Sequence, residues 1–419
     1  MSESTSRKYE PHLDWMLLIP VFALIAFGVV AVAIASFKAG TPEQPLLKHI
    51  VENPTATKQV IFMVVAFVVC TFITLLNYEL LRKMAFTSFA FGIFFLAVTF
   101  FLSKASGVKA WLDFAYGFTI QPSEFIKLAI ILQLSKMLSR VAEPLSTWRE
   151  FVHVMIYVGI TGAVILIQGE MGSMLVILFM VAAMFYFANV KAKTLWLLAA
   201  AAVIGILILW VAMTLFNADS YRLQRILAFL NPDLYSLSDA YQMQQSKMAI
   251  GSGGLYGIGQ FVDGSMSQLD YVPADWTDFI FATIGESFGF IVCTSIILLY
   301  LFIILRMLYL ARYTRDKFGQ LVIIGVMSMF TFHVIENIGM TMGLMPITGI
   351  PLPFLSYGGS NMVTSITGIG MVLNVTLNRA TTLEITAPQM EVYPYLPPKL
   401  RHQSMRKLIR GKKSSPKLK

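Results

Sequence analysis

Charged side chains are scarce in this 419-residue chain, in which Asp, Glu, Lys and Arg together make up only 13% of the residues. That share is about half of what a typical soluble domain carries. Hydrophobic residues make up 57%, which excludes a disordered chain and a fibrous repeat. The only two cysteines, Cys70 and Cys293, sit in apolar runs, so a disulfide-stapled secreted module is also excluded.

The common signatures of soluble enzymes are missing as well. The sequence contains no HExxH, Walker A, CxxC or GxSxG motif, which removes the usual metalloprotease, ATPase, zinc-site and serine-hydrolase interpretations. Five glycines cluster between 251 and 259, but their spacing does not match a dinucleotide fingerprint. We expect them to form a flexible loop whose backbone closely approaches a lipid or a sugar. Gly285 and Gly289 form a GxxxG pair, which typically packs helices.

What the sequence has instead is a series of long apolar runs. About 20 apolar residues cross the hydrocarbon core of a membrane, and the mean hydropathy of this chain is +0.70. The runs predict an all-α polytopic membrane protein with about ten transmembrane helices. The expected spans are 13–37, 59–76, 84–102, 122–138, 151–167, 172–189, 194–216, 278–305, 319–342 and 362–377.

The positions of the basic residues predict how the chain is oriented. Most of the 32 lysines and arginines fall on one side if the N-terminus lies in the cytoplasm, which places both termini there. The resulting organisation is a cytoplasmic N-terminus (1–12), a transmembrane domain (13–378) and a basic cytoplasmic tail (379–419). We expect the terminal run of this tail, 399–419, to touch anionic membrane lipid and not nucleic acid. One long loop, 217–277, lies outside between the seventh and eighth helices and is too long for a simple connector.

Ionisable side chains within the spans are costly to bury and therefore are functional candidates. Glu124 and Lys127 are three residues apart on one helical face, so they can form a pair that either orients the helix or serves the activity. Glu286, His333 and Glu336 lie in the eighth and ninth spans. For these three, a hydrogen-bonded structural role and a proton-relay role both stay open.

Two stretches at the outer ends of the spans carry further candidates. Asp275 and Asp278 flank Trp276 where the long loop meets the eighth span. A carboxylate at this boundary suits a general base or a cation ligand, although Thr277 or Asp278 could instead cap the helix. The stretch 345–360 contains three prolines, which predicts an ordered re-entrant loop and not a helix.

These stretches carry the motifs of a known family. The chain resembles the SEDS (shape, elongation, division and sporulation) family, polytopic peptidoglycan glycosyltransferases, over nearly the whole membrane region. The motifs are Gln-Pro-Ser-Glu-Phe-Ile-Lys at 121–127, Thr-Asp-Phe-Ile-Phe at 277–281, and the segments 221–232, 245–259 and 346–360. The sequence Gly-Ile-Pro-Leu-Pro at 349–353 is more similar to the elongation, rod-shape branch than to the division branch.

The resemblance implies the SEDS fold with ten transmembrane helices, and lipid II as the substrate in a bacterial plasma membrane. Asp278 matches the essential aspartate of the family, and Glu124 with Lys127 matches its polar pair. In the implied reaction, Asp278 takes the proton of the acceptor hydroxyl. The external basic residues would stabilise the leaving pyrophosphate, and a divalent cation such as Mg or Mn could share that task. These residues are Lys109, Arg222, Arg225 and Lys247, and further substrate contacts are expected from Trp111, Asp275, Ser356 and Tyr357.

The resemblance also implies protein partners: a class B penicillin-binding protein, which is a transpeptidase, and other proteins of the elongation or division complex. Two other classes of function stay open from the residues alone. Ten spans with buried carboxylates and broken helices are also typical of a transporter, which here would move lipid II across the membrane. A non-enzymatic scaffold for such a complex is the third interpretation.

Overall fold

The structure is a computed structural model that describes residues 13–38, 45–103, 110–113, 119–141, 143–216, 225, 229–230 and 239–378. Residues 13–376 form one compact unit. Ten long helices in this part are α1 (Trp15–Ala35), α3 (Pro54–Leu75), α4 (Tyr78–Leu102), α5 (Pro122–Leu138), α6 (Trp148–Gln168), α7 (Met171–Phe187), α8 (Ala192–Phe216), α11 (Ile280–Tyr313), α12 (Lys317–Thr341) and α13 (Gly359–Leu377). Two shorter helices are α2 (Leu46–Glu52) and α10 (Asp239–Ser252).

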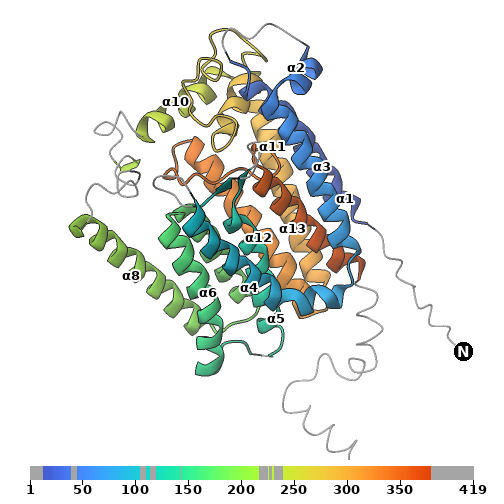
Figure 1. The fold of residues 1–419 in the computed structure, drawn as a ribbon, viewed down its shortest axis with the longest axis vertical. Helices are drawn as coiled ribbons and strands as arrows, with labels where there is room; N and C mark the ends of the chain where they lie inside the picture. Colours follow the sequence, from blue (N-terminus) through green and yellow to red (C-terminus); the bar gives the residue numbers. More distant parts are fainter. Residues whose placement is uncertain are drawn as a thin grey trace, which may run out of the picture. The chain divides into compact units, whose positions relative to one another are not determined.

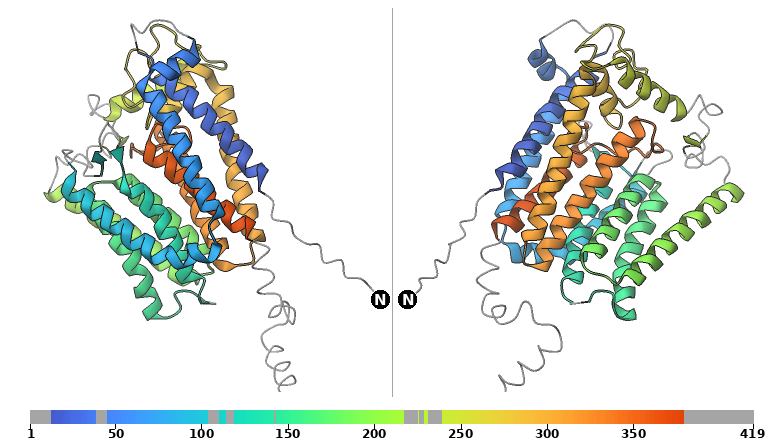
Figure 2. Two further views of the ribbon diagram at one scale, coloured as in Figure 1. Left: turned by 45° about the vertical axis from the view of Figure 1, so that its right-hand side comes forward. Right: turned by 180° about the vertical axis from the view of Figure 1, so that it is seen from behind.

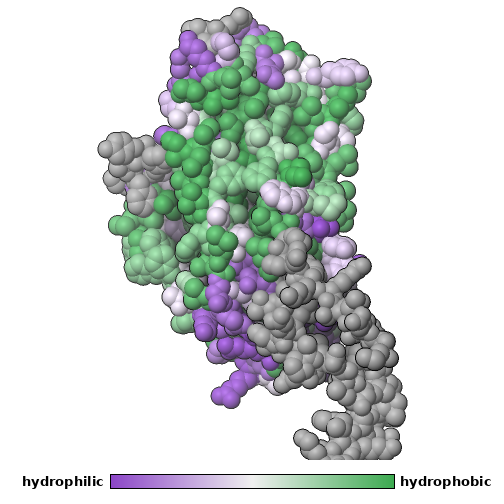
Figure 3. Space-filling model, turned by 90° about the vertical axis from the view of Figure 1, so that its right-hand side faces the viewer, coloured by the Kyte–Doolittle hydropathy of each residue, from purple (hydrophilic) through white to green (hydrophobic). Residues whose placement is uncertain are grey.

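Each of the ten expected spans overlaps one long helix, and the expected all-α fold is confirmed. Six of these helices are long and apolar enough to cross a membrane: α1, α3, α4, α6, α11 and α12. Figure 3 shows the corresponding surface, a broad hydrophobic band between two hydrophilic ends. The chain is therefore a multi-pass membrane protein, whereas the count of ten crossings stays a prediction.

Local sequence explains where several helices begin and end. The side chain of Asp14 accepts a hydrogen bond from the backbone amide of Leu17 at the start of α1, and Asn53 and Asn77 do the same for α3 and α4. Gly169 ends α6 in a left-handed conformation with φ of 94°, which glycine adopts without steric cost. These caps fix the short turns between neighbouring helices.

The helices pack as a bundle around α12 (Figure 1). Helix α12 is buried along most of its length and contacts α5, α7 and α11. Figure 2 shows that α2 and α10 lie at one end of the bundle, whereas the connection between α5 and α6 lies at the other end. A small hairpin of β1 (Leu112–Asp113) and β2 (Thr119–Ile120) precedes α5.

Helix α11 is interrupted at Gly289, where φ is 75° and ψ is −171°. The glycine cluster fills this interruption: the amides of Phe290 and Ile291 donate to the carbonyls of Gly254 and Leu255. A Cβ atom at Gly257 would lie 2.2 Å from the carbonyl oxygen of Ser287, so only glycine permits this approach. Gly253 and Gly257 thus approach the backbone of α11 closely, and the expected approach of the cluster to a lipid or sugar stays a prediction.

Candidate active site

Asp278 lies in a turn directly before α11. The helix begins with Phe279 as its N-cap, and no side chain caps it, so the alternative that Thr277 or Asp278 is a capping residue is wrong. The Asp278 side chain is half-buried and points toward Gly349 of the loop that follows α12. Its backbone carbonyl accepts a hydrogen bond of 2.7 Å from Nδ2 of Asn337 on α12. This bond holds the backbone of the turn in place, and the carboxylate is not used as a helix cap.

Arg225 stands beside this carboxylate. A Cβ atom added at Gly349 would lie 3.4 Å from Oδ2 of Asp278 and 3.9 Å from Nη1 of Arg225. The guanidinium donates a hydrogen bond of 3.3 Å to the carbonyl oxygen of Ile347. Burial raises the pKa of Asp278 to about 6, and the charge of Arg225 limits this rise. A carboxyl group with such a pKa is ionised at neutral pH and still basic enough to accept a proton.

The segment 343–358 connects α12 to α13 without forming a helix, as expected for a re-entrant loop. Ser356 is buried; its hydroxyl donates to the carbonyl of Thr277 at 2.7 Å and accepts from the amide of Leu352 at 2.8 Å. The amide of Tyr357 donates to the carbonyl of Trp276 at 2.9 Å. Ser356 and Tyr357 therefore tie this loop to the turn that carries Asp278, and their contact with substrate stays a prediction.

Two residues that the sequence did not single out hold the loop from the other side. Gln59 on α3 is buried and donates through Nε2 to the carbonyl of Ser356 at 3.2 Å. Asn337 donates through the same Nδ2 to the carbonyls of Asp278 and Ile350, each at 2.7 Å. The only sequence signal for either residue is an uncharged polar amide inside an apolar span.

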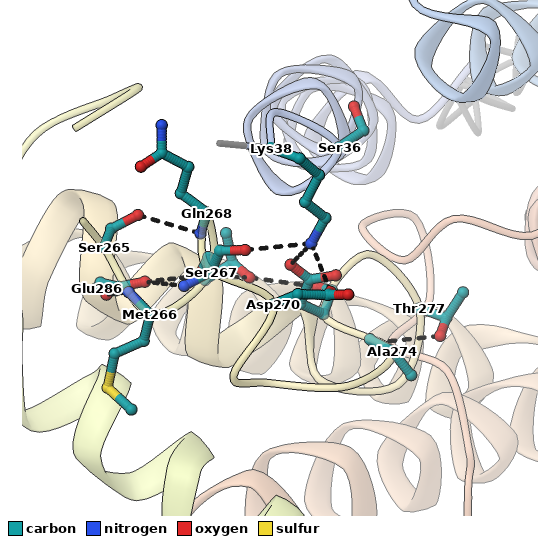
Figure 4. A network of polar contacts seen from close by, with 12 residues as sticks. Ser36, Lys38, Ser265, Met266, Ser267, Gln268, Asp270, Ala274, Thr277 and Glu286 are labelled. Atoms are coloured by element: carbon teal, nitrogen blue, oxygen red, sulfur yellow. Dashed lines mark hydrogen bonds and ion pairs between the residues drawn. The ribbon is translucent and has the colours of Figure 1, made fainter. Parts of the chain in front are cut away.

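Asp275 is fully buried behind the turn and is paired with Lys38 at the end of α1. The Lys38 ammonium lies 3.0 Å from Oδ2 of Asp275 and 2.9 Å from Oδ1 of Asp270, and it donates to the carbonyl of Ser267 at 3.1 Å (Figure 4). Burial raises the pKa of Asp275 to about 7, against the effect of Lys38. The sequence analysis did not single out Lys38. Through its bonds to Lys38, Asp275 supports the turn that carries Asp278.

A chain of polar contacts leads from the loop into the bundle. The expected pair is present: Nζ of Lys127 lies 2.7 Å from Oε1 of Glu124, and both side chains are buried. Nζ also lies 3.0 Å from Nε2 of His333, whose Nδ1 lies 3.1 Å from the carbonyl oxygen of Pro351. A carbonyl only accepts, so Nδ1 carries the proton and Nε2 accepts from the ammonium. The pair thereby supports the loop that faces Asp278.

The two remaining intramembrane carboxylates have different surroundings. Glu336 accepts a hydrogen bond of 2.9 Å from the hydroxyl of Thr348, which lies next to Gly349. Glu286 accepts from the amides of Met266 and Ser267 at 2.6 and 3.0 Å, and from the Ser267 hydroxyl (Figure 4). Glu286 therefore fastens the turn at 265–270 to α11, which is the structural alternative for this residue.

The other residues expected to contact substrate are Trp111, Lys247, Lys109 and Arg222, and the structure describes only the first two of them. Trp111 is 40% exposed directly before β1. Lys247 on α10 is exposed, and its side chain lies over Gly343 at the start of the loop. Lys109 and Arg222 lie outside the described residues.

Within the described ranges, no group of three His, Cys, Asp or Glu side chains is arranged to hold a metal ion. Asp278 would offer a divalent cation a single carboxylate. Magnesium is often bound in that way, with substrate phosphates and water supplying the other ligands. The residues present thus fit a cation shared with a phosphate-bearing substrate, and the cation stays a prediction.

Comparison with known proteins places this geometry in a family. The model of the FtsW/RodA/SpoVE family, described as cell cycle protein, matches residues 14–381. The chain belongs to this family, the SEDS family. It is 36% identical to stage V sporulation protein E of Bacillus subtilis over 271 residues, which cover 64% of this chain and 72% of that protein. It is 31% identical over 287 residues to the peptidoglycan glycosyltransferase MrdB of Escherichia coli K12; these residues cover 68% of this chain and 76% of that protein.

Solved structures show the same fold. One is a chain from a peptidoglycan synthase complex that coordinates polymerization and crosslinking; it matches with a TM-score of 0.72 at 23% identity, covering 88% of this chain and 98% of that one. The rod shape determining protein RodA of Thermus thermophilus matches with a TM-score of 0.63 at 22% identity, covering 88% and 97%. The SEDS fold expected from the sequence is confirmed.

Proposed function

We propose that this SEDS protein is a peptidoglycan glycosyltransferase that polymerises lipid II, with both termini in the cytoplasm and Asp278 facing the opposite side. The observation that carries the proposal is the half-buried carboxylate of Asp278 beside Arg225, with a pKa raised to about 6. Relatives named peptidoglycan glycosyltransferase support the reaction class. Relatives from the sporulation, division and elongation branches all occur, so the elongation role rests on the motif at 349–353.

The reaction joins two substrate molecules. The C4 hydroxyl of the acceptor GlcNAc attacks C1 of the donor MurNAc; the new C–O bond forms as the bond from C1 to the pyrophosphate oxygen breaks. Asp278 takes the hydroxyl proton as general base, which typically contributes about 10²–10⁴-fold in rate. Undecaprenyl pyrophosphate leaves with the bonding electrons, and Arg225 stabilises its charge. A divalent cation, if bound, would share in that stabilisation.

The loop at 343–358 supplies the precision that this chemistry needs. Its bonds to Thr277, Trp276 and Asn337 fix the position of Asp278 relative to Gly349. A misplaced catalytic group loses much of its effect, because the reacting atoms must approach within about 3–3.5 Å. The substrate tails would remain in the bilayer, which explains why the enzyme is a membrane protein.

Purified protein with lipid II alone tests the proposal. Wild type should produce glycan chains, and Asp278→Asn should lose them while keeping its thermal unfolding midpoint. Asp263→Asn, a change to a carboxylate of the same external loop away from Gly349, is the matched control and should polymerise normally. Translocation of lipid II without chain formation would favour the transporter, and a normal rate for Asp278→Asn would refute the assignment of the base.

A further inference from the structure

A cavity of about 730 Å³ lies between α4, α5 and α6. Helix α5 begins beside the candidate active site, where the amide of Gln121 donates to the hydroxyl of Ser360. Its last turn, with Lys136, is nine residues beyond Lys127 and hence about 13 Å farther along the helix axis. The cavity opens around this last turn. It therefore lies toward the end of the bundle that carries the α5–α6 connection, away from α2 and α10 (Figure 2).

The walls of the cavity combine apolar and polar side chains, and the cavity is partly open. Phe86 of α4 lines it and is 54% exposed, and Val154 and Tyr157 of α6 form the opposite wall. The apolar part of this lining, between membrane helices, suits hydrocarbon chains better than water. The cavity is also within the size range of small-ligand sites, about 300–1,000 Å³.

The rim of the cavity carries an excess of positive charge. Three basic residues line the rim: Lys136, Arg140 and Arg149. The ammonium of Lys136 is repelled by the positive charges of Arg140 and Arg82. Among the residues that the structure describes, no carboxylate lies within 4.0 Å of the charged nitrogens of these rim residues. Glu150 is the carboxylate on the rim. Like charges repel one another, and an anion bound between them would offset that repulsion.

A buried side chain adds an independent indication of a ligand. Gln133 of α5 lines the cavity and is only 5% exposed, yet its Oε1 has no hydrogen-bond partner within the described part of the chain. A buried carbonyl oxygen without a hydrogen-bond partner destabilises the folded protein. A ligand with a hydroxyl group would donate the missing hydrogen bond to this Oε1.

We propose that this cavity binds the headgroup of an anionic phospholipid, with its phosphate between Lys136 and Arg140. Basic pockets between transmembrane helices are suited to such headgroups. Free phosphate carries the same negative charge as a lipid headgroup, but it has no hydrocarbon chains to contact the apolar side chains of Phe86 and Tyr157. The glycerol hydroxyl of phosphatidylglycerol, or the central one of cardiolipin, would donate to Oε1 of Gln133. The bundle would thus carry a regulatory or stabilising lipid at the end remote from Asp278.

The test uses the full-length protein in nanodiscs. Retained lipid is measured by native mass spectrometry, and the unfolding midpoint is measured with phosphatidylglycerol, phosphatidylcholine, or phosphatidylcholine plus inorganic phosphate. Phosphatidylglycerol should be retained and should raise the midpoint. The double variant Lys136→Gln with Arg140→Gln should weaken retention about 30-fold, which corresponds to about fivefold for each of the two basic residues. Lys193→Gln with Arg315→Gln, two exposed charges that do not line the cavity, should retain the lipid.

A further variant keeps the test decisive if the double variant does not fold. Glu150→Gln removes the negative charge from the rim and should strengthen retention. Equal retention of phosphatidylcholine, or equal losses in the cavity and control variants, would overturn the proposal. Protection by inorganic phosphate alone would show that the anion is a soluble phosphate and would overturn the choice of a lipid.

Discussion

Oδ2 of Asp278 lies so close to Gly349 that a Cβ atom there would contact it at 3.4 Å. Gly349 has a φ of 71°, in the left-handed region, and Arg225 lies on the same side of it. The loop after α12 therefore forms one wall of the candidate active site. Its conformation, and not only the identity of Asp278, decides whether a substrate hydroxyl can reach the carboxylate.

The pH dependence of polymerisation should report the ionisation of Asp278. Burial raises its pKa to about 6, and only the ionised form can accept a proton, so the rate should fall about tenfold per pH unit below 6. Initial rates between pH 5 and 8 measure this limb, with the unfolding midpoint recorded at each pH. Asp275, with a pKa of about 7, also titrates nearby. If Asp275→Asn abolished the acidic limb, the limb would belong to Asp275 instead.

Gly349→Ala should lower both stability and activity. A residue with a Cβ costs about 1–2 kcal/mol in the left-handed region, and here the methyl group also enters the space before Asp278. Gly264→Ala is a matched control, because its φ is 82° and its Cβ would meet nothing within 4 Å. Both variants should lose similar unfolding free energy, whereas only Gly349→Ala should lose polymerisation beyond that. Equal activities of the two variants would contradict the role of Gly349 as a wall of the site.

Lys127→Ala should destabilise the bundle. The change strands the buried carboxylate of Glu124 and removes the donor to Nε2 of His333; losing one partner of a buried pair costs about 3–5 kcal/mol. Thermal unfolding in detergent measures the loss. The double variant Glu124→Gln with Lys127→Met removes both charges and should recover much of the stability. A Lys127→Ala variant of normal stability would contradict burial of the pair.

The sequence was sufficient to predict the helices and the local pair, because both depend on short spacings. Apolar runs locate spans, and a separation of three residues places Glu124 and Lys127 on one face. The supports of the site are contacts between distant segments: Lys38 with Asp275, and Gln59 with Ser356. Periodicity gives the face of each helix but not the partner that this face meets, so these contacts required the structure.

For the glycine cluster too, the sequence predicts a property of the backbone but not the segment that it contacts. Its composition correctly indicates that the backbone approaches something closely, because glycine lacks a Cβ. What it approaches depends on the interruption of α11 at Gly289, which leaves backbone groups that the carbonyls of Gly254 and Leu255 satisfy. A GxxxG pair is equally compatible with an interface to another protein. Here Gly285 packs against Ile250 of the same chain.

The last prediction concerns a partner that crosslinks the glycan strands. A similar fold occurs in a peptidoglycan synthase complex that coordinates polymerization and crosslinking, and the family resemblance implies a class B penicillin-binding protein. A partner raises activity only if it binds the competent arrangement of the enzyme more tightly than the idle one. The turn with Asp278 is fastened through contacts with the loop 343–358 and with Asn337, so a partner that orders these segments would favour the competent arrangement.

We therefore expect purified protein to polymerise lipid II slowly, and its cognate transpeptidase to raise the rate even when the crosslinking serine of the transpeptidase is inactivated. A rise of tenfold corresponds to about 1.4 kcal/mol of preference for the competent arrangement. Lys38→Gln would loosen Asp275 and should reduce the rate of the isolated protein more than that of the complex, because the partner would restore the order of the turn. A full rate without the partner, and no response to it, would contradict this activation while leaving Asp278 as the general base.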